Sequence, residues 1–185
     1  MPKVAHDRLK AIGEALMIAH GVPAEEAEIV MRHSVEANLV GHDSHGIIQI
    51  PTYLERVKQG HIVPGAPWQI VQESATTTVI DGNWGFGYVV NEKAMKYTIE
   101  KAKKQNVAAA TVFRQSHIGR LASYPLLAAA EGMEVAQCPE HRLLRNVLRQ
   151  HRIAGQPARK SVHRIEMRKH QRAKSLERGR VRLRR

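Results

Sequence analysis

The pattern of hydrophobic and polar positions predicts two helices at the start of the chain. Apolar residues recur near helical spacing over residues 5–20 and again over residues 24–39. Pro23 lies where a proline suits the first position of the second helix. Gly41 then interrupts the pattern, and the polar run HDSH at residues 42–45 is expected to form a turn.

The segment after this turn predicts a short helix followed by two strands. The run PTYLERVKQG, from Pro51 to Gly60, fits a short helix. WQIVQES at residues 68–74 and TTTVID at residues 76–81 have the β-branched character of strands. The polar turn DGN, residues 81–83, is expected to close the second strand.

The following segments continue to alternate between helix and strand. NEKAMKYTIEKAKKQN, residues 91–106, is amphipathic and carries Glu92 and Lys96 as an i,i+4 ion pair. VAAATVF, residues 107–113, predicts a buried strand, and SHIGRLASYPLLAAAEG, residues 116–132, predicts a turn leading into a helix. This alternation indicates the α/β fold class.

Composition changes near residue 133. Residues 134–185 hold 16 Lys and Arg, 4 Glu and no aromatic residue, whereas residues 1–133 hold equal numbers of bases and acids. The whole formal net charge of +12 therefore lies in the last 52 residues. A segment with so little apolar surface does not order itself. We expect an α/β domain portion over residues 1–133 and a basic tail, poorly ordered or translated out of frame, over residues 134–185.

The basic tail raises nucleic acid as a partner. Lysine and arginine attach to phosphates without regard to sequence, but the tail has no aromatic side chains on which bases can stack. Nucleic-acid binding is therefore kept only as a second alternative. The single cysteine, Cys138, excludes an internal disulfide, and no apolar run has the length of a membrane span or the form of a signal peptide. We expect a soluble cytoplasmic protein.

The HDSHG motif, residues 42–46, is the first candidate for chemistry. Imidazole gives and takes protons at neutral pH, and Ser44 or Asp43 can orient a ring. The local pattern alone favours another interpretation, a solvated turn at a helix end. No metal site is expected at His42 and His45, because no cysteine or carboxylate cluster nearby completes a ligand set.

Two further motifs are weaker when each is taken alone. DGNWGFG, residues 81–87, has the spacing GxxGxG rather than GxGxxG and is better interpreted as a glycine-rich connection. RQSHIGRLASY, residues 114–124, follows a predicted strand and opens a helix, whose N-terminus can bind an anion. Arg120 adds a positive charge and His117 a titratable group. Ser116 as the N-cap of this helix is the compatible structural interpretation.

Four blocks together carry a resemblance. GHDSHGIIQIPTYLERVKQGHIVPG, IDGNWGFGYVV, AMKYTIEKAKKQNVAAATV and SHIGRLASYPLLAAAEGM resemble, in order and spacing, the N-terminal part of the malate/L-lactate dehydrogenase family, closest to its hydroxycarboxylate dehydrogenase branch. The resemblance covers about residues 5–133. It implies an α/β fold that is not a Rossmann fold, and hydride transfer between NAD or NADP and a small 2-hydroxy or 2-oxo acid. Family members are usually homodimers.

The resemblance also implies roles for single residues. His45 would be the general acid/base, and Ser44 would place the substrate or the imidazole. A 2-oxo acid needs a cation for its carboxylate, for which arginine is best suited. Many members carry an arginine where this chain has Gln49. The substrate site is therefore expected to include Gln49 and Arg120.

The SHIGR block would complete the pocket and hold part of the cofactor. The residues implied are His117, Gly119, Arg120 and Leu121. The family is considerably longer than this chain, and most of its nucleotide-binding region follows the block that ends in AAAEGM. Nothing in residues 134–185 resembles that region. We therefore expect a truncated or frameshifted member, which is either a 2-hydroxyacid dehydrogenase or its inactive remnant.

Overall fold

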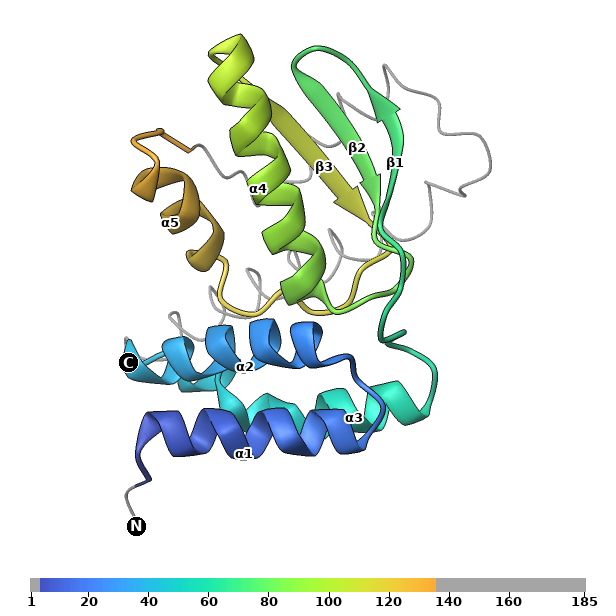
Figure 1. Ribbon diagram of the computed structural model, residues 1–185, viewed down its shortest axis with the longest axis vertical. Coiled ribbons are helices and arrows are strands. Elements are labelled where there is room, and N and C mark those ends of the chain that lie inside the picture. The colour runs from blue at the N-terminus through green and yellow to red at the C-terminus, as the bar shows by residue number, and fades with distance from the viewer. Residues whose placement is uncertain (1–3, 136–185) are drawn as a thin grey trace, which may run out of the picture. The chain divides into compact units, whose positions relative to one another are not determined.

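The computed structural model describes residues 4–135 (Figure 1). These residues belong to the unit Met1–Gln137, which the description below concerns. The expected basic tail, and nucleic-acid binding through it, lie almost entirely outside the described residues. Within residues 4–135, no helix is both long enough and apolar enough to cross a membrane.

Helices form the N-terminal half of the described unit, and α1 packs along α2. In chain order the elements are α1 (His6–Ala19), α2 (Ala24–Leu39), the two 3-10 turns η1 (Asp43–His45) and η2 (Ile47–Gln49), and α3 (Ile50–Lys58). The three predicted helices are thus confirmed. Pro23, however, precedes α2 as its N-cap rather than occupying the first helical position. The HDSH motif forms η1 as a turn between α2 and α3.

A three-stranded sheet and two helices form the other half. The elements are β1 (Gln69–Glu73), β2 (Thr77–Asp81), α4 (Gly87–Gln105), β3 (Ala109–Phe113) and α5 (Ser123–Ala130). The strand order is β1-β2-β3, with β1 antiparallel and β3 parallel to β2. Helix α4 crosses over between β2 and β3 and contacts β3 and α5 (Figure 1). This mixed arrangement confirms the α/β fold class.

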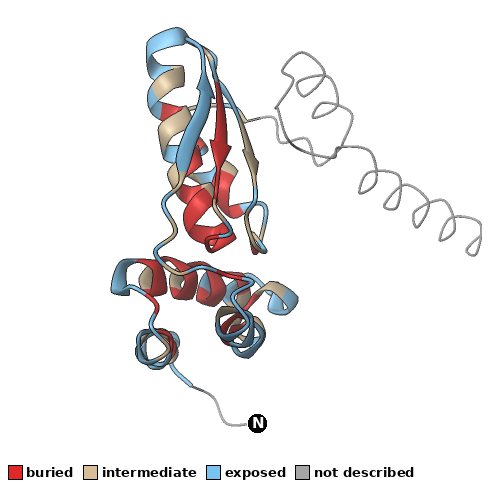
Figure 2. Ribbon diagram, turned by 90° about the vertical axis from the view of Figure 1, so that its right-hand side faces the viewer, coloured by how far each residue is buried: buried red, intermediate tan, exposed pale blue. Residues whose placement is uncertain are grey.

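Two local predictions differ from the structure. Helix α4 begins at Gly87 rather than near residue 91, because Tyr88, Val89 and Val90 pack into the core as its first turn. The prediction of a buried strand at β3 is wrong, since Ala109 and Ala110 are exposed. Among the described residues β3 lies at an edge of the sheet, whereas β2 lies between two strands and is buried (Figure 2).

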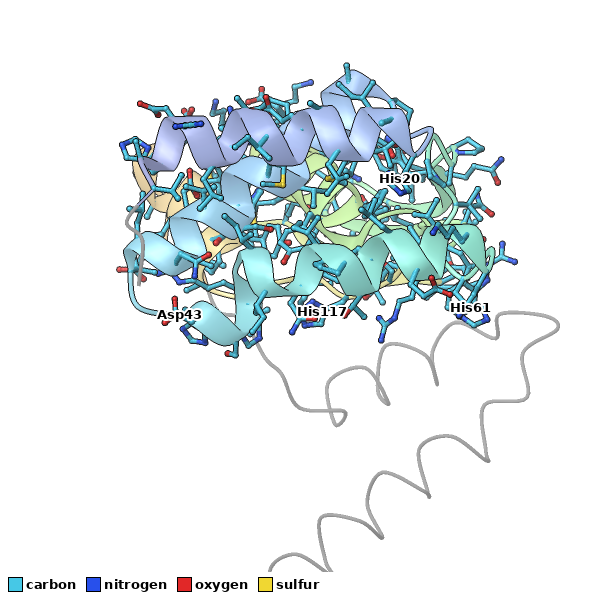
Figure 3. All side chains as sticks on the ribbon, turned by 90° about the horizontal axis from the view of Figure 1, so that it is seen from below. His20, Asp43, His61 and His117 are labelled. Atoms are coloured by element: carbon cyan, nitrogen blue, oxygen red, sulfur yellow. The ribbon has the colours of Figure 1, made fainter. Side chains whose placement is uncertain are left out.

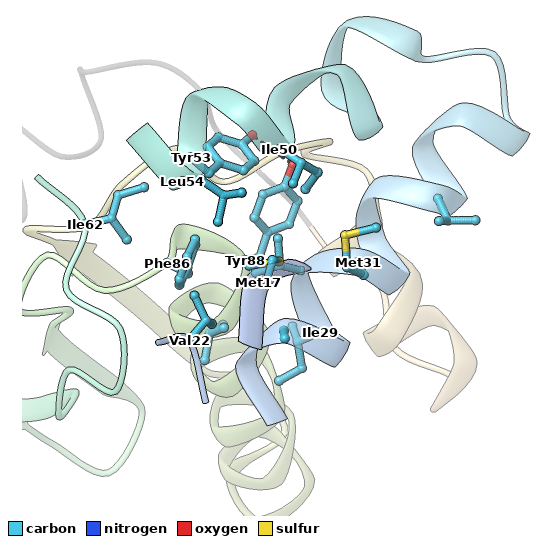
Figure 4. Close-up of a cluster of buried hydrophobic side chains, with 14 residues drawn as sticks. Met17, Val22, Ile29, Met31, Ile50, Tyr53, Leu54, Ile62, Phe86 and Tyr88 are labelled. Carbon is cyan, nitrogen blue, oxygen red and sulfur yellow. Dashed lines mark hydrogen bonds between the residues drawn. The ribbon is translucent and has the colours of Figure 1, made fainter. Parts of the chain in front are cut away.

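The hydrophobic core joins the helical half to the sheet half. Tyr53 of α3 and Tyr88 of α4 meet in it, with Met17, Met31 and Phe86 among their buried neighbours (Figure 4). Each of these side chains is 2% exposed or less. Complete burial of a side chain of this size stabilises the fold by about 1.5–3 kcal/mol. The contact between α3 and α4 also brings the HDSH turn close to the loop that precedes α5.

Candidate functional site

Asn38, near the end of α2, anchors the HDSH turn. Its Nδ2 donates to Asp43 Oδ1 at 2.6 Å, and its Oδ1 accepts the backbone N–H of Ile47 at 2.9 Å. A Cβ at Gly46 would lie 2.2 Å from Asn38 Oδ1. A side chain at position 46 would therefore displace the Asn38 amide from its contacts with the turn.

His45 is half-buried within this turn. Its Nδ1 lies 2.9 Å from the hydroxyl of Ser44, one of the two residues expected to orient a ring. Asp43, the other orienting candidate, bonds to α2 instead. The His42 ring packs edge-on against His45, with ring centroids 4.7 Å apart. Gln49 Nε2 donates to the Ser44 carbonyl at 2.9 Å, so this expected substrate residue also supports the turn.

The SHIGR loop, residues 116–120, is held by the beginning of α4. Ser116 Oγ accepts the backbone N–H of Gly87 at 3.0 Å, and a Cβ at Gly87 would lie 2.4 Å from the Ser116 carbonyl oxygen. The prediction that Ser116 caps the helix after it is wrong. That helix, α5, begins only at Ser123, with Ala122 as N-cap. The Ser116 hydroxyl instead accepts a free N–H from the first turn of α4.

Two histidines from separate loops lie side by side. The rings of His45 and His117 have centroids 5.4 Å apart and are tilted by 32°. His117 lies on the same side of the molecule as α3 (Figure 3). The structure thus brings together the titratable groups of two motifs that lie far apart in the sequence.

Two tyrosines connect the histidines, and neither was identified from the sequence. Tyr53 OH lies 2.8 Å from His117 Nδ1 and 3.1 Å from Tyr88 OH. Tyr88 OH in turn donates to the backbone carbonyl of His45 at 3.3 Å. Both tyrosines lie on faces that sequence patterns assign to a core, so no sequence signal distinguishes them from ordinary core aromatics.

Burial controls the protonation of this group. It raises the pKa of Tyr53 far above the ordinary value, with a further contribution from the hydrogen bond to Tyr88, and it also raises the pKa of Tyr88. Both hydroxyls therefore keep their protons. Partial burial lowers the pKa of His117 most, and electrostatic interactions with His45 and Arg56 lower it further. His117 is consequently neutral at physiological pH.

The other residues expected from the SHIGR block surround His117. Gly119 has φ +68°, and a Cβ there would lie 2.0 Å from the Tyr88 ring, so only glycine fits. Arg120 is half-buried, and no ion pair to its guanidinium occurs within residues 4–135. Leu121 is 40% exposed. Ser123 Oγ at the start of α5 is buried and has no hydrogen-bond partner among the described residues.

A buried charged network lies behind Tyr88. Glu92 and His33 are 2% and 3% exposed, and Glu92 Oε2 lies 2.7 Å from His33 Nε2. Arg32 Nη2 donates to both carboxylate oxygens, at 3.1 and 2.8 Å, and Lys96 donates to one at 2.8 Å. The sequence predicted only the pair with Lys96. The His33 ring packs against Tyr88 with centroids 5.7 Å apart, so this network supports the tyrosine.

Candidate metal ligands were compared over the described residues, 4–135. Over residues 4–135, no three or more His, Cys, Asp and Glu side chains are placed so that they could hold a metal ion. His42 and His45 do contact each other, but the neighbouring carboxylate of Asp43 is bound to Asn38. The imidazoles of His45 and His117 can transfer protons, and the hydroxyls of Tyr53 and Tyr88 can form hydrogen bonds.

The sequence matches a family model described as malate/L-lactate dehydrogenase over residues 4–138. Hydroxycarboxylate dehydrogenase B of Escherichia coli O157:H7 is 38% identical over 119 residues, which cover 64% of this chain and 33% of that protein. L-sulfolactate dehydrogenase of Methanocaldococcus jannaschii is 42% identical over 113 residues, covering 61% of this chain and 33% of that protein. The chain thus spans about a third of the length of the curated relatives it matches.

The structure resembles those of the same group of proteins. The crystal structure of malate dehydrogenase from Entamoeba histolytica superposes with a TM-score of 0.69 at 39% sequence identity. The match covers 71% of this chain and 37% of that one. Sequence and structure therefore agree on the resemblance that the four sequence blocks indicated, and they confirm it together with the fold that it implied.

Proposed function

The chain belongs to the malate/L-lactate dehydrogenase family, and we propose that it carries the proton-transfer part of an oxidoreductase acting on small 2-hydroxy and 2-oxo acids. The observation that carries this proposal is the pairing of His45 with His117, whose rings lie 5.4 Å apart although they come from separate loops. The relatives are named as hydroxycarboxylate, L-sulfolactate and malate dehydrogenases, which supports an acid of this class as substrate.

His45 is proposed as the general acid/base. Ser44 engages its Nδ1, and no hydrogen bond to its Nε2 occurs within the described residues. Nε2 is therefore available to protonate the oxygen of a 2-oxo acid as hydride reaches the adjacent carbon, and to take the proton back in the reverse direction. Ser44 acts by holding the imidazole in one orientation, because its hydroxyl lies within hydrogen-bond distance of the other ring nitrogen.

The substrate carboxylate is proposed to bind Arg120. Its guanidinium has no acidic partner among residues 4–135, and arginine binds carboxylates with two parallel hydrogen bonds. Gln49 contributes a neutral amide near the same turn, but its Nε2 is already bonded to the Ser44 carbonyl. The main role of Gln49 is thus to keep the turn in shape, with its amide oxygen left for the substrate.

A nicotinamide cofactor, NAD or NADP, supplies or accepts the hydride when it is bound. The residues present fit part of such a group. Arg120 of the SHIGR loop has no acidic partner within residues 4–135, and Ser123 at the start of α5 has a buried hydroxyl with no hydrogen-bond partner among the described residues. His117, Gly119, Arg120 and Leu121 are proposed to hold this part of the cofactor. Their contribution to the chemistry is to orient the ligand and exclude water from the reacting carbon.

The 185-residue chain by itself is expected to bind NADH weakly. It spans about a third of its relatives, so a dinucleotide meets only a few of the contacts that position the nicotinamide. The alternative function is accordingly that of an inactive remnant. Titration of the purified chain into NADH, followed by the cofactor's fluorescence, should show no saturation at micromolar concentrations. Saturable binding in that range would contradict this expectation.

Two further expectations accompany the proposal. The single cysteine and the expected nicotinamide chemistry support a cytoplasmic location. A homodimer is proposed from the family resemblance. Light scattering on the purified chain measures its mass directly, and a monomeric mass at high concentration would argue against the dimer.

A chimera tests the proposed function. Residues 5–133 of this chain replace the matching segment of hydroxycarboxylate dehydrogenase B from Escherichia coli O157:H7, and NADH-dependent reduction is measured with a panel of 2-oxo acids. The chimera should be active, and His45→Gln should lower kcat by about 100-fold or more. His61→Gln, at an exposed histidine after α3, should leave kcat unchanged. A chimera that unfolds cooperatively but reduces no 2-oxo acid would refute the proposal.

A further inference from the structure

The Nδ1 atom of His117 has two hydrogen-bond partners. The backbone N–H of Gly119 lies 3.3 Å away and the hydroxyl of Tyr53 lies 2.8 Å away. An amide N–H can only donate, so Nδ1 accepts and carries no proton in this arrangement. A neutral imidazole that accepts at one nitrogen has its proton on the other. The backbone of the SHIGR loop therefore decides the tautomer of His117.

The same reasoning orients the tyrosine hydroxyls. Tyr53 keeps its proton because it is buried, and it donates this proton to His117 Nδ1. Its oxygen is then free to accept from Tyr88 OH at 3.1 Å. Tyr88 also lies 3.3 Å from the His45 carbonyl, which can only accept, so the single hydroxyl proton of Tyr88 is shared between the two contacts. The hydrogen bonds thus run in one direction, from Tyr88 through Tyr53 to His117, and each one strengthens the next.

His45 is free of this constraint. Its Nδ1 faces the hydroxyl of Ser44, which can either donate or accept, so both tautomers of His45 keep the bond. His117, in contrast, loses the bond from Gly119 whenever its Nδ1 gains a proton. Electrostatic interactions with His45 from the HDSH turn and with Arg56 from α3 also disfavour a second proton on the His117 ring.

We propose that Gly119 and Tyr53 are positioning residues that hold His117 as the neutral tautomer with its proton on Nε2. This Nε2–H is then a standing hydrogen-bond donor to an oxygen of the substrate, while His45 transfers the proton. A neutral imidazole polarises a carbonyl in this way without changing its own charge. The role in the reaction rests on the proposed function, but the tautomer belongs to the chain without any ligand.

The tautomer is measured directly by nuclear magnetic resonance. Long-range correlations between ring protons and ring nitrogens of the 15N-labelled, 185-residue chain report which nitrogen carries the proton. The His117→Gln variant assigns the signals by their loss. In mildly alkaline solution we expect an unprotonated Nδ1 and a protonated Nε2 for His117. A protonated Nδ1 would overturn the proposal, whatever the outcome of the chimera experiment.

The Tyr53→Phe variant tests the role of the tyrosine. It removes one donor to Nδ1 and keeps the buried ring, so the neutral form of His117 loses stabilisation and its pKa rises by about 0.5–1 unit. Part of the population should also move its proton to Nδ1. Tyr97→Phe, which removes a hydroxyl that donates to Glu73, is the matched control and should change neither property. An unchanged titration and tautomer of His117 in Tyr53→Phe would remove Tyr53 from the proposal.

If Tyr53→Phe does not fold, the spectrum of the unsubstituted chain still decides the tautomer of His117.

Two outcomes separate this inference from the proposed function. If the chimera is inactive while His117 shows the expected tautomer, the positioning geometry stands and the assigned reaction fails. If the chimera is active while His117 Nδ1 is protonated, the proposed function stands and the proposed tautomer of His117 is wrong.

Discussion

Replacing Glu92 by glutamine tests whether the buried charged network stabilises the fold. The Glu92 carboxylate is almost fully buried and accepts hydrogen bonds from His33, Arg32 and Lys96. Glutamine has nearly the same shape, but it lacks the charge and replaces one acceptor oxygen with an amino group. That amino group then faces donors, so at least one buried polar group loses its partner.

The expected loss comes mainly from the contact with His33. Lys96 has a 63% exposed side chain, and an ion pair so open to solvent contributes little. Arg32 is 31% exposed and keeps access to water, whereas His33 and Glu92 are both 3% exposed as side chains. Removing one partner of a buried pair costs about 3–5 kcal/mol. Because the glutamine oxygen still accepts a hydrogen bond, we expect a loss of about 3 kcal/mol in the free energy of unfolding at neutral pH.

The pH dependence has a definite sign. Burial alone would raise the pKa of Glu92, but the hydrogen bonds from His33, Lys96 and Arg32 reverse this and hold it well below the ordinary value. The carboxylate therefore contributes its full stability above the pKa of an unfolded glutamate, about 4.3. As the pH falls from there towards the folded pKa, the contribution decreases by about 1.4 kcal/mol per unit. The deficit of Glu92→Gln should consequently shrink in acid.

Urea denaturation followed by circular dichroism measures this deficit. Unfolding curves of the chain and of Glu92→Gln are compared at neutral pH and at a pH below the unfolded glutamate pKa of about 4.3. Glu100→Gln is the control on the same helix, since Glu100 pairs with Lys103 in an exposed position, and it should change stability little. A Glu92→Gln variant as stable as the control at neutral pH, or a deficit that does not depend on pH, would refute this account of the network.

Three further substitutions have expected outcomes. Gly119→Ala combines φ +68° with a Cβ 2.0 Å from the Tyr88 ring, so it should destabilise more than Gly21→Ala, where φ is +83° but the space is open; urea denaturation compares the two. Tyr88→Phe removes the hydroxyl that donates to the His45 carbonyl and should cost about 1 kcal/mol in the free energy of unfolding, measured by the same method; an unchanged value would show that the bond contributes nothing. Asn38→Ala frees the HDSH turn and should speed proteolysis there, whereas cleavage at the rate of the unsubstituted chain would show that Asn38 is not the anchor.

The sequence by itself determined most of the local structure. The helical period over residues 5–20, 24–39 and 91–106 corresponds to α1, α2 and α4, and the β-branched runs correspond to β1 and β2. These elements follow from side chains within a few residues of one another, which set both the period of burial and the backbone preference. The order of four motif blocks likewise sufficed to indicate the family.

Only the tertiary structure decided how these elements share their polar groups. Glu92 belongs to an i,i+4 pair in the sequence, yet its buried partner His33 lies 59 residues away. Ser116 precedes one helix but bonds to the start of another, 29 residues earlier, and Tyr53 reaches His117 across 64 residues. Periodicity reports which face of an element is apolar, but a hydrogen bond depends on which two elements pack together and at what distance. The hydrogen bonds of Tyr53 and Tyr88 that link the two histidines therefore could not be predicted from the sequence, because they depend on the packing of α3 against α4.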